Sequence, residues 1–488
     1  MPQLNRRHFL TGSLLTGAAV TLAPGRVLGA NEEIRAAVIG FKSRGQSHID
    51  DLINLPGVRL VALCDLDPAV LARGKEALAK KNISVDTYAD VRHVLDRKDI
   101  DVITTATPNH WHSLIGVWAC QAGKDSYIEK PISHNVWEGR QLVKAARKHG
   151  RIVAGGTQNR SNGRIQAAVD WVRAGNLGKI RSVTGYCFKP RMSIGKVGHG
   201  EIPAGLDYNL WTGPAPMKPL ARKNLHYDWH WVYDTGNGDM GNQGIHQMDV
   251  ARWFLGVKEL SPRVMSVGGR LGYDDDGETP NTQVVYHDYD EAPLIFETRG
   301  LPRSKEFHDP SLWSKNMDEP ELFPGAGGIS VVVDCEGGKV VVGGNPVAYD
   351  RSGKKIQEFQ PAFESKGHMA NFIEAVRARK RELLTAESEE THLSSALCHT
   401  GMISHLLGKR ASTEEIRESI KSDAFAAERF EAMREHLARN GVSLDSTQAT
   451  LGPWLTMDPK REKFTNNKEA NALLSREYRK PFTVPEKL

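Results

Sequence analysis

The sequence has few of the features that mark disulfide-stabilised, metal-binding or membrane-spanning proteins. Its five cysteines in 488 residues are scattered, odd in number and never spaced C-x-x-C, so we expect neither a disulfide framework nor a metal site. No stretch after the first 30 residues approaches the roughly 20 apolar residues of a membrane span. Internal repeats and low-complexity segments are also missing. At this length, two globular domains are expected.

The chain carries only a small excess of positive charge. The formal net charge is +5, but Arg6, Arg7 and Arg26 lie in an acid-free N-terminal stretch. Without these three, 61 basic residues face 59 acidic ones. So small a surplus gives no electrostatic support for binding nucleic acid or an anionic membrane, and we expect neither as a partner.

Residues 1–30 are predicted to be an export signal. Asn5-Arg6-Arg7-His8-Phe9-Leu10 precedes an uncharged stretch that ends at Pro24, and small residues follow at Gly29-Ala30. This pattern is typical of a twin-arginine signal. Because the apolar part is short for a membrane span, a removed signal is favoured over a retained anchor. We therefore expect a periplasmic or otherwise extracytoplasmic protein.

From residue 34, short apolar runs alternate with amphipathic helical stretches. Such alternation predicts βαβ units, a parallel sheet and helices on both of its faces. Residues 31–155 are therefore expected to form a doubly wound, Rossmann-type α/β domain that binds a nucleotide at the carboxyl ends of its strands. The expected strands are 34–40, 58–65, 101–107 and 126–129.

Residues 156–488 are predicted to form an α+β domain. Several strands follow one another without helices between them, and Glu336-Gly337-Gly338 is a hairpin signal, so a mainly antiparallel open sheet is expected. Its strands are expected at 180–188, 263–270, 282–289, 294–298, 329–335 and 339–342, and its helices near 165–174, 369–379, 392–407 and 425–440. The stretch 190–243, rich in glycine, tryptophan and histidine, is suited to a binding wall.

The first strand is followed by Gly40-Phe41-Lys42-Ser43-Arg44-Gly45, which keeps the outer glycines of G-x-G-x-x-G but has lysine at the middle position. The alternative for this segment is a plain strand-to-helix turn. We expect Gly40 and Gly45 to shape the turn, and Lys42, Ser43 and Arg44 to donate to phosphates. Asp65 ends the second strand, where an acid accepts hydrogen bonds from the adenosine ribose and repels a 2′-phosphate. NAD is therefore favoured over NADP.

Three further segments carry a family resemblance: Thr107-Pro108-Asn109-His110-Trp111-His112, the strand end Glu129-Lys130-Pro131, and Gly238 to Asp249 with its histidine at 246. In these the sequence resembles the glucose-fructose oxidoreductase, inositol dehydrogenase and rhizopine-catabolism (Gfo/Idh/MocA) family. The resemblance implies a nicotinamide-dependent sugar oxidoreductase whose E-K-P lysine contacts substrate and nicotinamide ribose. It implies these cofactor-binding residues: Thr107, Pro108, Asn109, His112, Glu129, Lys130 and Gln158. It also places Arg160 beside the substrate.

His246 resembles the general base of that family. Asp249 lies one helical turn further on and is expected to hold the imidazole in one tautomer. Many members carry an aspartate four residues before this histidine, whereas this chain has Asn242, which can orient a ligand but cannot take up a proton. Proton transfer is therefore assigned to His246 and Lys130, with Asp239 as a possible substitute.

Aromatic rings interleaved with polar groups are suited to a sugar, since a pyranose stacks on rings while its hydroxyls need directional partners. Tyr208, Trp229 and His230 are the candidate wall residues, although they also fit packing against the sheet. Metal binding by His226 and His230 with Asp228 or Asp234 is an alternative that hydride chemistry does not require.

The leading hypothesis is hydride transfer between a hydroxyl-bearing carbon of a sugar and NAD. Two alternatives are a NAD-dependent glycosidase, which oxidises a glycoside transiently with a retained cofactor, and a sugar-binding protein without catalysis. The resemblance and the wide sheet further suggest a homo-oligomer built face to face.

Overall fold

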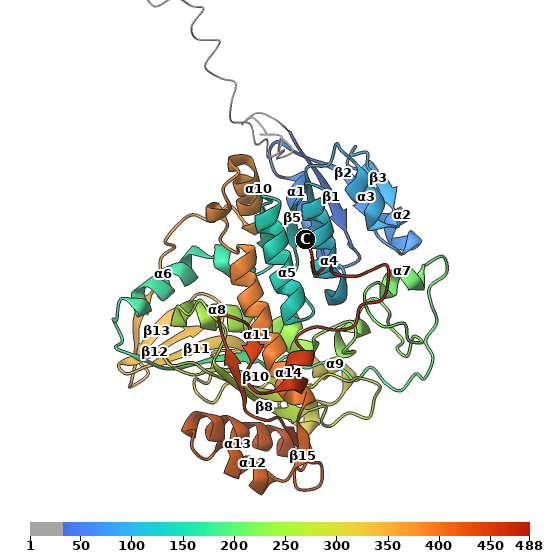
Figure 1. Ribbon diagram of the computed structural model, residues 1–488. Coiled ribbons are helices and arrows are strands. Elements are labelled where there is room, and N and C mark those ends of the chain that lie inside the picture. The colour runs from blue at the N-terminus through green and yellow to red at the C-terminus, as the bar shows by residue number, and fades with distance from the viewer. Residues whose placement is uncertain (1–32) are drawn as a thin grey trace, which may run out of the picture.

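The computed structural model describes residues 33–488, so the expected export signal lies outside the described residues. Two sheets organise the chain (Figure 1). The first has six parallel strands in the order β3-β2-β1-β4-β5-β6, which confirms the doubly wound domain. These strands are β1 (Ile34–Ile39), β2 (Val58–Cys64), β3 (Asp86–Tyr88), β4 (Val102–Thr105), β5 (Asp125–Ile128) and β6 (Val153–Gly155).

Helices cover both faces of this sheet, because its central strands are buried almost throughout and need apolar cover on each side. Three of the helices, α2 (Pro68–Ala79), α3 (Val91–Asp96) and α5 (Val136–Lys148), begin at a capping side chain. Asp67, for example, accepts hydrogen bonds from the backbone of Ala69 and Val70, with Pro68 at the first helical position. The other two are α1 (Arg44–Ile53) and α4 (Asn109–Gln121).

The second sheet is antiparallel except where β7 pairs in parallel with β10, which confirms the mainly antiparallel prediction. Its main path runs β14-β13-β12-β11-β7-β10-β9-β8-β16-β15, and β11 and β12 form the expected hairpin. Its strands are β7 (Ile180–Cys187), β8 (Arg263–Gly269), β9 (Thr282–Asp288), β10 (Leu294–Arg299), β11 (Ile329–Cys335), β12 (Gly338–Val342), β13 (Val347–Asp350), β14 (Lys355–Glu358), β15 (Lys409–Ala411), β16 (Ala449–Leu451), β17 (Leu455–Asp458) and β18 (Lys463–Phe464).

One face of the second sheet is packed against helices that lie between it and the first domain (Figure 1). Phe254 and Met248 of α8 and Leu397 of α11 belong to the main apolar core with strands β7 to β11. The helices beyond α5 are α6 (Gly163–Arg173), α7 (Tyr208–Thr212), α8 (Ile245–Leu255), α9 (Pro310–Trp313), α10 (His368–Ala378), α11 (Ser388–Leu406), α12 (Thr413–Ile420), α13 (Ala424–Arg439) and α14 (Lys468–Ala472).

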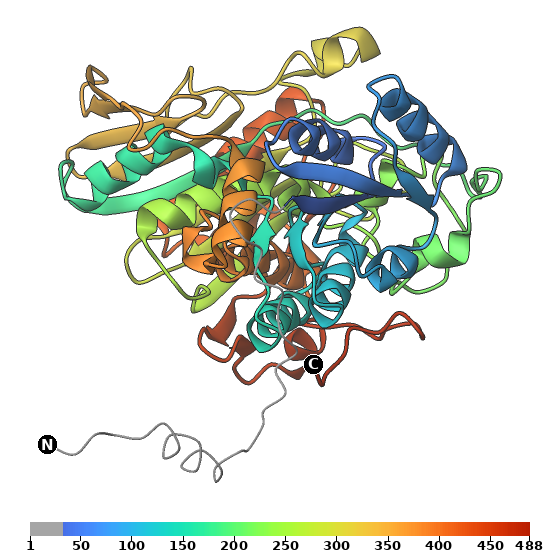
Figure 2. The same cartoon turned by 90° about the horizontal axis from the view of Figure 1, so that it is seen from above.

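Two distant segments return to the first domain. Phe372 and Ile373 of α10 pack in one core with Ile34 of β1 and Leu52 of α1. The C-terminal segment runs along α4 and α5 (Figure 2), and its Phe482 joins the core beneath α4. The core of the nucleotide domain therefore draws on residues well beyond 31–155.

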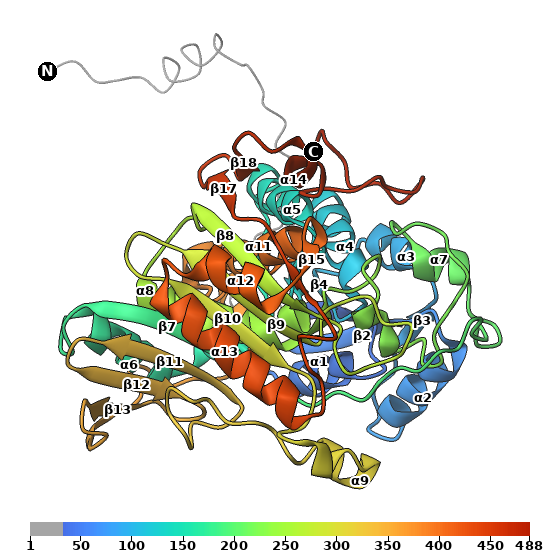
Figure 3. The ribbon, with the colours of Figure 1, turned by 90° about the horizontal axis from the view of Figure 1, so that it is seen from below.

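The opposite face of the second sheet is covered by α12 and α13 (Figure 3). Phe430 and Met433 of α13 pack on Val267 of β8 and Ile295 of β10. An oligomer built face to face through this side of the sheet would need the strands to be uncovered. Because α12 and α13 cover β8 to β10, another copy cannot pack directly on these strands. Among residues 33–488, no helix is both long and apolar enough to cross a membrane.

Candidate functional site

The glycine turn has the geometry that its sequence suggested. Gly40 has φ +73°, and a Cβ there would lie 2.9 Å from Thr107 Cγ2. A Cβ on Gly45 would lie 2.1 Å from the Gly40 carbonyl oxygen. Both outer glycines are therefore required for the close approach of β1, β4 and α1, while Lys42 and Ser43 are exposed on the turn.

Asp65 lies against this turn at the end of β2. Its Oδ2 accepts a hydrogen bond from the Phe41 backbone N–H at 3.1 Å, and its Oδ1 accepts from the Asp67 N–H at 3.1 Å. Burial raises the pKa of Asp65, while these two N–H groups oppose the rise. The carboxylate is thus fixed beside the glycines, as an adenosine-ribose site requires.

One cavity of about 340 Å³ joins the turn to the end of β5. Most of the predicted cofactor residues line it: Gly40, Lys42, Ser43, Arg44, Asp65, Thr107, Pro108, Asn109, His112, Glu129 and Lys130. Of the predicted substrate residues, Lys130, Trp229, His230 and Asn242 line it. The turn, the acid and an elongated cavity fit a dinucleotide that spans the carboxyl edge of the sheet.

Six predicted residues lie outside this lining: Gly45, Gln158, Arg160, Tyr208, His246 and Asp249. Tyr208 stacks on Trp211 with its ring plane tilted by only 9°. Gln158 donates from Nε2 to Glu129 Oε1 at 3.0 Å and lies in a neighbouring cavity. These two side chains therefore support the lining from behind.

Glu129 collects hydrogen bonds from α1 and from the end of its own strand. Its Oε1 accepts from Arg44 Nε at 2.8 Å and lies 3.3 Å from His48 Nε2, and its Oε2 accepts from the Lys130 N–H at 3.1 Å. Burial opposes ionisation of Glu129, but the His48 hydrogen bond and the nearby cations outweigh it and hold its pKa well below the usual range. Arg44 is thereby tied to the end of β5, while it also lines the cavity beside Lys42 and Ser43.

Lys130 follows Glu129 and reaches across the cleft. Its Nζ donates to the Asn242 carbonyl oxygen at 2.8 Å. Burial is the main cause that lowers the pKa of Lys130, and the charges of Arg44 and Arg191 add to it. The ammonium thus lies between the two domains, at the end of the cavity away from Asp65.

His246 stands in the first turn of α8, directly after a π-helical turn, Met240–Gly244. Burial and the nearby charge of Lys130 lower its pKa to about 4, so the imidazole is neutral at physiological pH. The two predicted catalytic groups are therefore brought together, although His246 lies outside the cavity lining.

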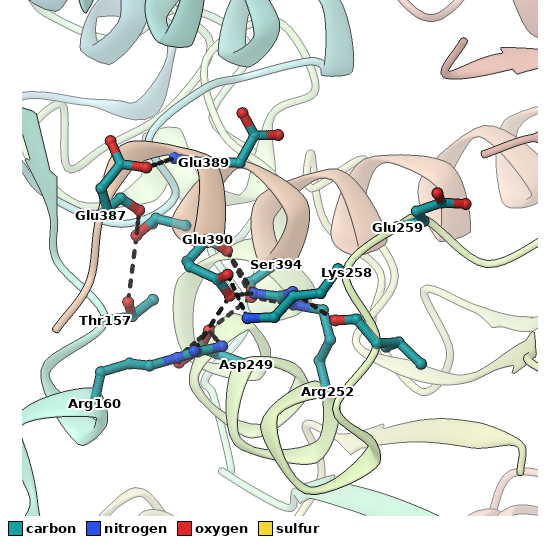
Figure 4. Close-up of polar contacts among 12 residues, drawn as sticks. Thr157, Arg160, Asp249, Arg252, Lys258, Glu259, Glu387, Glu389, Glu390 and Ser394 are labelled. Atoms are coloured by element: carbon teal, nitrogen blue, oxygen red, sulfur yellow. Dashed lines mark hydrogen bonds and ion pairs between the residues drawn. The ribbon is translucent and has the colours of Figure 1, made fainter. Parts of the chain in front are cut away.

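The expected hydrogen bond between Asp249 and His246 is absent from the described residues. Asp249 instead accepts from Arg160 Nη2 at 2.9 Å and from Ser394 Oγ at 2.7 Å (Figure 4). Helical spacing alone suggested the pair, but the arginine and the serine, from distant segments, satisfy the fully buried carboxylate. Neither Arg160 nor Asp249 lines the cavity.

This network extends to α11. Glu390 accepts from Arg252 Nη2 at 2.7 Å and from Lys258 Nζ at 2.7 Å, and its Oε2 lies 3.3 Å from Arg160 Nη1. Figure 4 shows these side chains converging from three segments. The network therefore fixes α8, and with it the backbone of His246, against the segment that follows β6.

Sequence reasoning missed several lining residues, among them Lys189, Arg191, His226 and Tyr227. Arg191 pairs with both carboxylate oxygens of Asp239, at 3.0 and 2.7 Å, and donates to Tyr227 Oη at 2.8 Å. Asp239, considered as a substitute base, is thus held as an ion-pair partner. A cation four residues beyond the end of β7 gave no specific signal for this role.

Residues 190–236, the cover segment, close the cavity opposite the first domain. His226 Nε2 lies 2.8 Å from Asp67 Oδ2, and Trp111 Nε1 donates to the Trp211 carbonyl oxygen at 3.1 Å. Leu66 packs against the apolar cluster of this segment, and α7 lies beside α3 in Figures 1 and 3. A bound dinucleotide would thus lie between two walls that are joined directly.

The structure does not assemble the alternative metal site. His226 is engaged by Asp67, and the His230 ring stacks on Trp229 with centroids 3.6 Å apart. Within the part of the chain that the structure describes, no group of three or more His, Cys, Asp or Glu side chains is arranged to hold a metal ion.

Two family models match the chain. Residues 34–157 match one described as "oxidoreductase family, NAD-binding Rossmann fold", of the GFO_IDH_MocA type. Residues 171–308 match its companion, "oxidoreductase family, C-terminal alpha/beta domain". Together these matches cover more than half of the 488 residues.

Curated relatives match over a shorter stretch. Glycosyl hydrolase family 109 protein 1 of Shewanella sp. (strain ANA-3) is 33% identical over 174 residues, which is 30% of this chain and 38% of the relative. An alpha-N-acetylgalactosaminidase of Shewanella oneidensis is 31% identical over the same shares. The match thus spans well under half of these relatives' length.

Solved structures match over most of the chain at low identity. The WlbA dehydrogenase of Bordetella pertussis, solved in complex with NADH and UDP-GlcNAcA, has TM-score 0.54 and 20% identity, covering 75% of this chain and 93% of its own. An oxidoreductase of Agrobacterium radiobacter, solved with NAD+, L-tartaric acid and magnesium, has TM-score 0.52 and 14% identity, covering 76% and 95%. At these identities the likeness is one of fold.

Proposed function

Because the chain belongs to the Gfo/Idh/MocA oxidoreductase family, we propose that it moves a hydride between a hydroxyl-bearing carbon of a sugar, or sugar derivative, and NAD. The observation that carries this proposal is the cavity that joins the glycine turn and Asp65 at one end to Lys130, His230 and Asn242 at the other. When bound, the dinucleotide supplies the hydride acceptor or donor. Asp65 selects NAD, since its charge would repel a 2′-phosphate.

The protein groups at the far end are suited to a polyhydroxylated substrate. Lys130 donates to the reacting hydroxyl and favours its alkoxide, while His246, held neutral beside it, takes up the proton. Trp229 and Tyr227 line the same cavity and offer ring faces to a pyranose. The sugar-nucleotide complex of the structurally similar WlbA dehydrogenase supports a sugar derivative as substrate.

A NAD-dependent glycosidase is the second candidate, and two observations favour it. The curated relatives are glycosyl hydrolase family 109 proteins. The His226 to Asp67 contact also holds the cover segment against the first domain, which suits a cofactor that is retained and recycled in place. In that case the enzyme would oxidise a glycoside, eliminate its aglycone and then reduce the product.

The test begins with mass spectrometry of the purified protein for retained dinucleotide, followed by a screen of sugars and glycosides. A dehydrogenase produces net reduced nicotinamide, whereas a glycosidase releases free sugar without net reduction. We expect Lys130→Ala and His246→Ala each to lower turnover by roughly 10²-fold or more while NAD still binds. Unchanged turnover in either variant contradicts the assigned roles, and a protein that binds sugars without any product is a binding protein.

We also propose export by the twin-arginine route, supported by the Arg6-Arg7 motif and the apolar stretch after it. Changing both arginines to lysine should keep the protein in the cytoplasm, as measured by cell fractionation.

A homo-oligomer remains part of the proposal. Its interface would lie away from the strands that α12 and α13 cover, and light scattering of the purified protein tests it.

A further inference from the structure

Cations gather at the substrate end of the cavity, where Lys130 and Asn242 lie. Arg191 lines the same cavity and pairs with Asp239 at 2.7 Å. Asp239 directly precedes the π-helical turn Met240–Gly244, and within this turn the Asn242 carbonyl oxygen accepts from Lys130 Nζ at 2.8 Å. One short segment of the second domain therefore holds both a guanidinium and an ammonium beside the cavity.

Lys189 adds a third cation, and it has no protein partner. It lies two residues before Arg191, a span of at most about 7 Å, and its half-buried side chain lines the same cavity. Within residues 33–488, neither an ion pair nor a hydrogen bond joins the ammonium of Lys189 to another side chain or to the backbone. The group is thus a free donor of three hydrogen bonds on the cavity wall.

Positive charge exceeds negative charge at this end. The carboxylates whose charges act on Lys130 are Glu129 and Asp239. Each already has a guanidinium partner, because Glu129 accepts from Arg44 and Asp239 from Arg191. Among the described residues, the two lysine ammonium groups are therefore left without a carboxylate of their own. A bound oxidised nicotinamide would add one more positive charge.

The pKa values of neighbouring groups agree with this excess. Burial lowers the pKa of Lys130, and the charges of Arg44 and Arg191 add to the effect although Glu129 opposes it. Burial also lowers the pKa of His230, to about 3, and the charges of Lys130 and Arg191 act in the same direction. In a partly buried cavity, water screens such charges less than at an open surface, so the cavity attracts anions and repels cations.

We propose that the substrate is a sugar that carries an anionic group, a carboxylate or a phosphate, and that Lys189 binds this group while Lys130 holds the reacting hydroxyl. The inference rests on the proposed function and leaves His246 as the proton acceptor. Arg191 is held by both carboxylate oxygens of Asp239, so it contributes its charge, whereas the ammonium of Lys189 is free to bond to the anion.

The phosphates of the dinucleotide are the competing partner for Lys189. They are expected at the glycine turn, where Lys42 and Ser43 are exposed. Lys189 instead accompanies Arg191, which is bound to the segment that contacts Lys130 at the opposite end. The two partners predict different losses in a Lys189 variant, either of affinity for the charged sugar or of affinity for NAD.

The first test compares sugars that differ in charge. D-glucuronate is set against D-glucose, D-galacturonate against D-galactose, and glucose 6-phosphate is included as the phosphate. Their p-nitrophenyl glycosides cover a glycosidase outcome. We expect kcat/KM of the wild-type protein to be at least about tenfold higher for a uronate or the phosphate than for the neutral sugar, mainly through a lower KM.

Two substitutions at one position separate charge from shape. Lys189→Met removes the ammonium but keeps a long side chain, and should lower the preference for the charged sugar by about tenfold or more. Lys189→Arg should keep most of the preference, because it retains the charge. Lys223→Met, which removes an exposed lysine of the cover segment, is the matched control and should equal the wild type.

A binding measurement does not depend on turnover. Calorimetric titration of D-glucuronate into the NAD-loaded protein should show weaker binding to Lys189→Met than to the wild type. Affinity of the wild type should also fall as sodium chloride is raised from about 0.05 to 0.5 M, because salt screens the attraction. NAD titrated into cofactor-free protein should bind equally well to both.

Four outcomes overturn the inference. Equal kcat/KM for charged and neutral sugars in the wild type contradicts it, as does a preference that Lys189→Met leaves unchanged. A tenfold loss of NAD affinity in Lys189→Met with the sugar preference intact assigns Lys189 to the cofactor phosphates. These three results leave the proposed function standing. A wild-type protein that gives no product and no change in nicotinamide absorbance with any of these sugars or glycosides overturns both.

Discussion

Replacing Asp249 by asparagine tests whether the buried network, rather than contact with substrate, explains this residue. The carboxylate is fully buried and accepts from Arg160 Nε and Nη2 and from Ser394 Oγ at 2.7 to 3.1 Å. Breaking a buried ion pair by removing one partner costs about 3–5 kcal/mol, because the other charge is left uncompensated. Since Glu390 still lies 3.3 Å from Arg160, we expect the lower end, about 3 kcal/mol.

The assay is urea unfolding followed by tryptophan fluorescence and circular dichroism. Glu431→Gln is the matched control, because it removes one carboxylate charge from surface pairs with Arg417 and Arg434 and should cost under about 1 kcal/mol. If Asp249→Asn costs no more than the control, the argument from burial is refuted. The double variant Arg160→Met with Asp249→Leu should regain much of the stability, because it leaves no unpaired charge.

Three other predictions follow from the site. Asp67→Asn weakens the contact that holds the cover segment, so the purified protein should retain less dinucleotide by mass spectrometry; equal retention contradicts a closing role. Asp65→Ser removes the charge beside the ribose and should improve the ratio of NADP to NAD affinity at least about tenfold in titrations, and an unchanged ratio would show that the acid does not select. The pKa of Glu390 is about 2, because the charges of Arg252 and Arg160 outweigh its burial. The ionised Glu390 should therefore stabilise the folded protein by about 3 kcal/mol above pH 4.5, and this contribution should disappear as the pH falls towards 2. The measurement is the free energy of unfolding against pH, and a profile identical to that of Glu390→Gln would contradict the prediction.

Local patterns predicted the elements that local physics determines. The strands of the first sheet are short buried runs, and the expected bounds 34–40 and 58–65 differ from β1 and β2 by one residue at the carboxyl end. Lys130 was identified from the family resemblance of the Glu129-Lys130-Pro131 strand end, and it lies at the edge of the sheet where the cavity lies. The two outer glycines follow from local geometry, because Gly40 adopts a left-handed conformation and a side chain at Gly45 would collide with the Gly40 carbonyl oxygen.

Pairings between distant segments could not be predicted in this way. Asp249 was assigned to His246 because three residues separate them on one helix, but its partners Arg160 and Ser394 lie 89 and 145 positions away. In the same way, α10 completes the core of the first domain from more than 300 residues downstream of β1, and its apolar face carries no sign of which sheet it will cover. Such contacts form because a buried charge needs a partner and an apolar face needs cover, and either can come from any part of the chain.

The charges at the substrate end bear on how a weakly basic imidazole can take up a proton there. Burial and the charge of Lys130 lower the pKa of His246, so an imidazolium beside the ammonium is unfavourable in the free protein. On the proposed function, a bound nicotinamide would lose its positive charge on accepting a hydride. The charge gained by the imidazole would then be offset, and the net charge around Lys130 would stay the same. Transfer of the proton to His246 would therefore be favoured together with hydride transfer rather than before it, which would make the low basicity of this histidine compatible with the proposed chemistry.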